Sequence, residues 1–113
     1  MKTENQNIEG HELIQLQVGV HQLIFVFEGD VTLSVESAVR FEVGTQKVDW
    51  LPEHPELAAS LTALVGQKVE RVEDGSEDEL RIVFVEGGTL AVSGRAPCGE
   101  AYQITSPNGV YIV

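Results

Sequence analysis

The sequence contains a single cysteine and no long apolar segment. With Cys98 alone the chain cannot form an internal disulfide, which agrees with a reducing compartment. The longest apolar run, Leu23–Phe27, has the length of a strand and is far shorter than the roughly 18 residues of a membrane-spanning helix. Residues 1–7 are polar and lack the apolar centre of a secretory signal. We therefore expect a cytoplasmic protein that does not enter a membrane.

Basic residues are also scarce: seven Lys and Arg stand against 18 Asp and Glu, and the formal net charge is −11. Nucleic-acid-binding proteins cluster Lys and Arg against phosphates. Here the central basic residues are scattered among carboxylates: Lys47, Lys68, Arg71 and Arg81. The charge disfavours nucleic acid as a partner and favours a basic protein, although an acidic balance also serves solubility alone.

Residues that bind metals are few and lack an informative spacing. The candidate ligands are His11, His21 and His54, together with Glu12 or Glu28. Metal sites that can be identified from sequence place two histidines four apart on a helix or use paired cysteines, and neither pattern is present. The sequence therefore predicts no metal site.

No catalytic or cofactor motif is present either. Cys98 lies in a predicted loop without a family signature around it, so a small apolar role is expected. Gly87-Gly88 stands between two predicted strands, whereas phosphate-binding glycine loops join a strand to a helix. We predict a protein that is not an enzyme and needs no cofactor.

An internal repeat is the most informative positive feature. The segment Leu23–Phe27, followed after a gap by Thr32–Val35, reappears 57 positions later as Leu80–Phe84 and Thr89–Val92. Upstream, an offset of 56 aligns Gly10, Leu13, Leu16 and Gly19 with Gly66, Val69, Val72 and Gly75. A sheet unit of about three strands cannot cover its own apolar face, so the two copies are expected to pack or pair around a shared core.

Alternation of apolar and polar residues predicts strands in both copies. The expected strands are 14–20, 23–27, 31–35 and 39–43, then a segment begun by Val69 and Val72, 80–84, 89–92, and a final hairpin that turns at Ser106–Gly109. Residues 23–27 are apolar on both faces, which is typical of a strand covered on each side. Between the copies, Pro55 suits the start of a helix that places Leu57, Leu61, Leu64 and Val65 on one face.

The predicted fold is therefore mainly β with one connecting helix. Residues 1–113 form a single domain, with repeat units at 10–44 and 66–113 and a linker with the helix at 45–65. Two antiparallel β-meanders built this way form a sandwich or a partly open barrel.

The candidate contacts for a partner are an acidic segment and the single tryptophan. Residues 70–79 are predicted as a loop with six carboxylates: Glu70, Glu73, Asp74, Glu77, Asp78 and Glu79. The spacing does not match a calcium loop, which leaves a hydrated hairpin tip or a recognition patch as alternatives. Trp50 precedes the helix, where it could anchor an interface or pack at the helix entry.

The second half of the chain resembles a family of short bacterial β-rich domains of unknown function over about 50 residues. The resemblance rests on the following positions: Gly66, Val69, Val72, Leu80, Ile82, Phe84, Gly87, Gly88, Leu90, Val92, Tyr102, Ile104 and Gly109. In size and charge the chain is also similar to the immunity proteins that bind and block a cognate toxin, a resemblance that assigns no role to individual residues.

Three functions are compatible with these features. The first is an immunity protein whose acidic surface binds a basic toxin domain, for example a nuclease. The second is a structural module that forms a homodimer through exposed strands, and the third is a β domain that binds a small ligand in a pocket.

Overall fold

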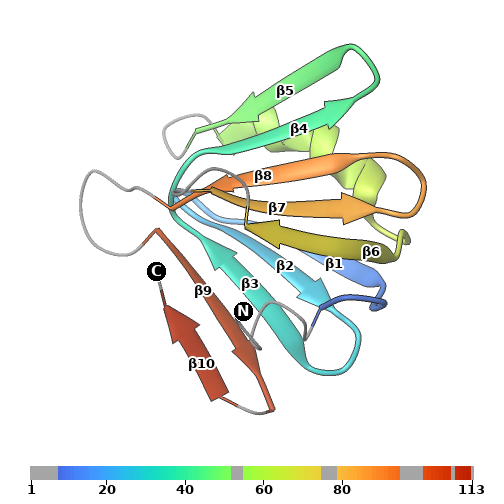
Figure 1. The fold of residues 1–113 in the computed structure, drawn as a ribbon. Helices are drawn as coiled ribbons and strands as arrows, with labels where there is room; N and C mark the ends of the chain where they lie inside the picture. Colours follow the sequence, from blue (N-terminus) through green and yellow to red (C-terminus); the bar gives the residue numbers. More distant parts are fainter. Residues whose placement is uncertain (1–7, 52–54, 75–78, 95–100, 108, 113) are drawn as a thin grey trace.

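The computed structural model describes residues 8–51, 55–74, 79–94, 101–107 and 109–112 (Figure 1). Its ten strands alternate with turns, and one 3-10 helix lies in the middle of the chain. In chain order these are β1 (Leu13–Val18), β2 (Leu23–Phe27), β3 (Val31–Val35), β4 (Val39–Val43), β5 (Gln46–Trp50), η1 (Pro55–Leu64), β6 (Val69–Asp74), β7 (Glu79–Phe84), β8 (Thr89–Ser93), β9 (Tyr102–Ser106) and β10 (Gly109–Ile112). The mainly β prediction is confirmed.

The strands form two five-stranded antiparallel sheets, and each half of the chain contributes to both. Sheet 1 has the order β1-β2-β3-β9-β10, and sheet 2 has the order β5-β4-β8-β7-β6. The last hairpin of each half therefore lies in the sheet begun by the other half: β4-β5 joins β8, and β9-β10 joins β3. The two copies share one fold by exchanging hairpins, so neither sheet is formed by one copy alone.

The pairing registers of the two halves match residue by residue. The β1-β2 pair begins at Leu13↔Phe27 with a register shift before Gln15, and β6-β7 begins at Val69↔Phe84 with the same shift before Arg71. The registers of the exchanged hairpins also match. The pair Val35↔Tyr102 joins the β9-β10 hairpin to sheet 1. In sheet 2 the corresponding pair is Val39↔Val92. The two halves therefore match in strand pairing as well as in sequence, and the match extends through the last hairpin of each half.

Hydrogen bonds between the first residues of the two repeats also occur in matching pairs. Gly10 N–H donates to Val69 O at 2.8 Å, and its counterpart Gly66 N–H donates to Leu13 O at 2.7 Å. An isolated antiparallel bridge joins Glu12 to Lys68. Backbone hydrogen bonds thus link the two sheets where β1 and β6 begin.

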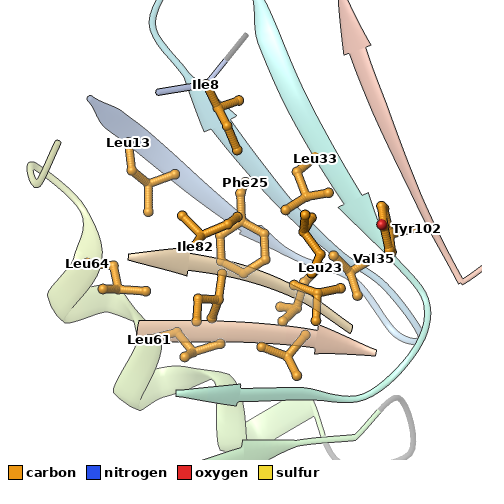
Figure 2. Close-up of a cluster of buried hydrophobic side chains, with 14 of the residues drawn as sticks. Ile8, Leu13, Leu23, Phe25, Leu33, Val35, Leu61, Leu64, Ile82 and Tyr102 are labelled. Carbon is orange, nitrogen blue, oxygen red and sulfur yellow. The ribbon is translucent and has the colours of Figure 1, made fainter. Parts of the chain in front are cut away.

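One hydrophobic core lies between the sheets. Figure 2 shows Leu13, Phe25 and Leu33 of sheet 1 directed toward Ile82 of sheet 2 and toward Leu61 and Leu64 of η1. All six side chains are at most 1% exposed. Full burial of each such side chain stabilises the folded state by about 1.5–3 kcal/mol. Two sheets over one core make the fold a β-sandwich.

The strand β5 was missing from the prediction, which assigned residues 45–65 to a linker and a helix. Gly44, at φ 58°, reverses the chain into β5, which pairs with β4 from Val43↔Gln46 to Val39↔Trp50. The strand β5 therefore follows residue 44, where the predicted first unit ends. Only Val48 and Trp50 are apolar in this strand, so its alternation is short.

The helix is present, but its turn is tighter than that of an α-helix. In a 3-10 helix, residues three apart lie on one face. Ala58, Leu61 and Leu64 share that spacing and are all buried, whereas Val65 is 41% exposed. The prediction that Val65 belongs to the buried face is wrong for this reason.

The outer side of β2 also differs from the prediction. Leu23, Phe25 and Phe27 are buried in the core, but Ile24 and Val26 on the other face are only half-buried. No described element lies over that face of sheet 1. The strand is therefore covered on one side, and the apolar residues of its second side reach the molecular surface.

Candidate partner-binding surfaces

The outer face of sheet 2 carries two rows of residues that run across all five strands. Residues directly opposite in an antiparallel pair point to the same face, so the register defines the rows. One row is Glu73–Arg81–Ala91–Arg40–Asp49, and the next is Arg71–Val83–Thr89–Glu42–Lys47. We call this surface the charged face.

Ion pairs organise the charged face at β6 and β7. Arg71 Nη1 lies 2.6 Å from Glu70 Oε2, and Arg71 Nε lies 2.5 Å from Glu73 Oε2. Arg81 Nη1 lies 3.3 Å from Glu79 Oε1, and its Nε lies 4.0 Å from Glu73 Oε1. These two arginines hold three of the predicted contact carboxylates in defined positions.

The ion pairs also shift the ionisation of their members. The hydrogen bond from Arg71 is the largest effect on Glu73 and lowers the pKa of that carboxyl, although partial desolvation acts in the opposite direction. The same hydrogen bond raises the pKa of Arg71. Across the sheet, the hydrogen bond from Arg40 Nε to Asp49 Oδ1, at 3.1 Å, raises the pKa of Arg40. Glu73, Arg71 and Arg40 are therefore charged at neutral pH.

The acidic segment 70–79 is two strands and a connection rather than a single loop. Glu70, Glu73 and Asp74 lie on β6, and Glu79 begins β7. The remaining two predicted contacts, Glu77 and Asp78, lie outside the described residues. The loop assignment was wrong because carboxylates with valines between them were interpreted as a hydrated run, whereas Val69 and Val72 anchor a strand.

Trp50 is part of the core and not of the surface. Its side chain has 0% exposure, and β5, on which it lies, packs against η1. The indole Nε1 has no hydrogen-bond partner within the described part of the chain. Packing at the helix entry was the correct alternative, and Trp50 is not available as a contact for a partner in this structure.

The outer face of sheet 1 is uncharged. Its rows are Gln15–Val26–Thr32–Thr105–Val110 and Gln17–Ile24–Ser34–Gln103, which are the counterparts of the rows on the charged face. None of the five strands of sheet 1 contains a charged residue. The strands of sheet 2 contain ten: Arg40, Glu42, Lys47, Asp49, Glu70, Arg71, Glu73, Asp74, Glu79 and Arg81.

Apolar side chains are exposed on and beside this uncharged face. Ile14, at the β1 bulge, is 50% exposed, and Val110, on β10, is 55% exposed. Ile24 and Val26 are half-buried between them in the sheet order. Sequence analysis missed this surface, although the absence of charge from residues 13–27 was a visible signal.

A groove of about 370 Å³ lies where η1, the β4-β5 hairpin and the β7-β8 turn meet. Phe41, Val43 and Val48 give it an apolar wall, and Gln67 and Glu86 add polar groups. Gln67 Oε1 is buried and has no hydrogen-bond partner among the described residues, while its Nε2 donates to Ala63 O at 3.2 Å. The groove can therefore hold an apolar group that carries a hydrogen-bond donor.

Of the three histidines, His11 contacts the turn between β2 and β3. His11 Nδ1 lies 2.8 Å from the carbonyl oxygen of Glu28, and because a carbonyl only accepts, Nδ1–H donates this bond. Glu28 Oε1 accepts from the backbone N–H of Glu12 at 3.0 Å. His21 lies in the exposed connection between β1 and β2. His54 and Cys98 lie outside the described residues.

Within the described ranges, no three His, Cys, Asp or Glu side chains are grouped so that they could hold a metal ion. The one described helix is too short to cross a membrane.

Two five-stranded sheets over one core, one with a charged and one with an uncharged outer face, define the class of the protein as a duplicated β-sandwich domain. The chain belongs to a family of unknown function, DUF6188, whose model matches residues 4–113. No curated protein and no solved structure matches the chain.

Proposed function

We propose that this chain is a non-enzymatic binding protein of the immunity type, which acts in the cytoplasm by docking an acidic surface on a basic toxin domain. The observation that carries the proposal is the charge of one hairpin. Residues 69–84, which include β6 and β7, contain six acidic residues against Arg71 and Arg81, a formal balance of −4. The counterpart residues 13–27 contain no Asp, Glu, Lys or Arg.

The geometry of the hairpin suits electrostatic docking. Side chains of Glu70 and Glu73 are 50% and 41% exposed, so a partner can reach carboxylates that Arg71 already orders. Groups held in place before binding lose less conformational entropy when the complex forms. The remaining negative charge attracts a cationic cleft, such as that of a nuclease, and accelerates encounter.

The test begins with capture of a partner. The tagged chain is used to recover binding proteins from the cytosol of its native host, and the double variant Glu77→Lys/Asp78→Lys is used in parallel. We expect a basic protein that the wild type retains and the variant loses. With the purified pair, stopped-flow measurements should show association slowed by roughly tenfold or more in the variant, with a weaker dependence on salt.

The matched control makes the same change in net charge at another place. Glu36 and Glu86 are both exposed and lie outside the hairpin, so Glu36→Lys/Glu86→Lys alters the total charge equally. We expect this control to change the association rate much less. If both double variants slow association equally, net charge rather than the hairpin steers binding, and the hairpin is removed from the interface.

A further inference from the structure

The strand β10 is an edge of sheet 1, and no described element covers it. It pairs with β9 on one side and is the last strand of its sheet in Figure 1. An edge strand presents backbone N–H and C=O groups that another strand can pair with. Its counterpart β5 is also an edge, but η1 packs against β5. Among the described elements, nothing equivalent packs against β10.

The edges of the two sheets also differ in charge. Proteins protect edge strands with charged residues, which make pairing with another chain unfavourable. Both edges of sheet 2 have such residues, Lys47 and Asp49 on β5 and Glu70 to Asp74 on β6. Neither edge of sheet 1, β1 or β10, has a charged residue, but η1 packs against β1 as it does against β5. At the position of Lys47, β10 has Val110, which is 55% exposed.

We propose that two copies of this chain associate by antiparallel pairing of β10 with β10 of the second copy. Sheet 1 then continues from one copy into the other as a ten-stranded sheet with an uncharged outer face. Identical antiparallel strands fulfil two-fold symmetry directly, since each residue meets the same set of partners in both copies.

The distribution of charge leaves β10 as the edge along which a second copy can pair without charge repulsion at the contact. Each copy has a net charge of −11, so two copies repel wherever their carboxylates approach one another. Pairing along β6 would bring Glu70, Glu73 and Asp74 of both copies together. Pairing along β10 brings together only uncharged residues, with Val110 beside the two-fold axis. A basic partner, by contrast, has its electrostatic complement on the β6-β7 hairpin.

The experiment is sedimentation equilibrium of the full chain over a hundredfold range of concentration, at low and at high salt. We expect a monomer–dimer equilibrium whose dissociation constant decreases as salt rises, because salt screens the repulsion between two anionic copies. An interface made of ion pairs would show the opposite dependence. A chain that stays monomeric throughout overturns the proposal.

Two variants locate the interface. Val110→Lys introduces the residue found at the counterpart position on β5 and places two lysines close together across the axis, so it should weaken dimerisation by roughly tenfold or more. Val85→Lys, at a turn residue with 59% exposure, adds the same charge away from β10. Its dimer should be at least as stable as that of the wild type. Equal effects of the two variants would overturn β10 as the interface.

Hydrogen exchange gives a readout that does not depend on a variant. Dimerisation should slow exchange of backbone amides in residues 109–112 and leave those of the β6-β7 hairpin unchanged. Protection of residues 109–112 that appears only when a basic partner is added would assign the β10 edge to that partner and overturn the proposal. Protection confined to β6 would show that the copies pair elsewhere and would overturn it as well.

Discussion

The two sheets have the same backbone plan and opposite surfaces. In the core, Leu23 and Phe27 of sheet 1 correspond to Leu80 and Phe84 of sheet 2, and all four are at most 1% exposed. On the outer faces, uncharged rows in sheet 1 correspond to rows with seven charged residues in sheet 2. The comparison shows that packing fixes the inner residues of both halves, whereas the outer residues are free to serve different contacts.

Core substitutions should give the largest effect and test whether the halves are one unit. Phe27→Ala and Phe84→Ala each remove a fully buried ring from a counterpart position, and each should lower the free energy of unfolding by about 3–5 kcal/mol. Because the hairpins are exchanged, urea unfolding followed by circular dichroism and by Trp50 fluorescence should give one coincident transition in both variants.

The control for these variants is Val18→Ala in sheet 1, at a position that is 51% exposed. It should change the free energy by no more than about 0.5 kcal/mol. If Phe27→Ala shifts the transition seen by circular dichroism but not the one seen by Trp50 fluorescence, the two halves unfold separately. The two sheets would then not form one cooperative unit.

A medium effect is expected at Gly88, where the two halves differ in volume. Its counterpart is Val31, but a Cβ at Gly88 would lie 2.6 Å from Cε1 of Phe41. Gly88→Ala should therefore lower the free energy of unfolding by about 1–3 kcal/mol through overpacking, as measured in urea.

The double variant Gly88→Ala/Phe41→Leu tests the cause of that loss. A smaller side chain at position 41 relieves the contact, so the two changes should cost less together than the sum of the separate losses. Additive losses would show that the ring of Phe41 does not limit the size of residue 88.

The smallest effect concerns acid stability. The pKa of Glu73 is lowered in the folded protein, so its ion pairs stabilise the fold above the ordinary carboxyl pKa of 4.5. This contribution is lost as the pH falls through the lowered value. In Glu73→Gln the melting temperature should lie below that of the wild type at neutral pH, and the two should converge in acid.

Gln17 is the counterpart of Glu73 and supplies the control. Gln17→Glu adds a carboxylate to a strand whose described neighbours carry no cation, so its melting curve should show no stabilisation at neutral pH. A wild-type advantage over Glu73→Gln that persists unchanged in acid would show that the carboxylate has another role.

Much of the fold could be predicted from local patterns. The offset of Leu23–Phe27 and Leu80–Phe84 revealed the duplication because core strands keep their apolar spacing. The offset of 57 does not continue into the last hairpins, because the second half has additional residues between β8 and β9. Val39 and its counterpart Tyr102 therefore differ by 63 positions. The exchange was not predictable, because pairing across halves leaves no mark on a single strand.

The candidate surfaces were predictable only in part. The acidic residues at 70–79 could be found by counting, but their ion pairs with Arg71 and Arg81 depend on strand pairing. The uncharged face depends on register still more strongly, since Ile24 and Val26 look like core residues until the fold leaves one side of β2 open. Trp50 is the opposite case: it lies in a polar segment and was considered as a surface contact, but its side chain is fully buried.

The exchanged hairpins make each half depend on the other. One half has no strand of its own to pair with its fourth strand, so it is complete only together with the other half, as in a domain-swapped pair. Here both members of the pair belong to one polypeptide. They therefore do not have to be identical, and each sheet can have an outer face of its own.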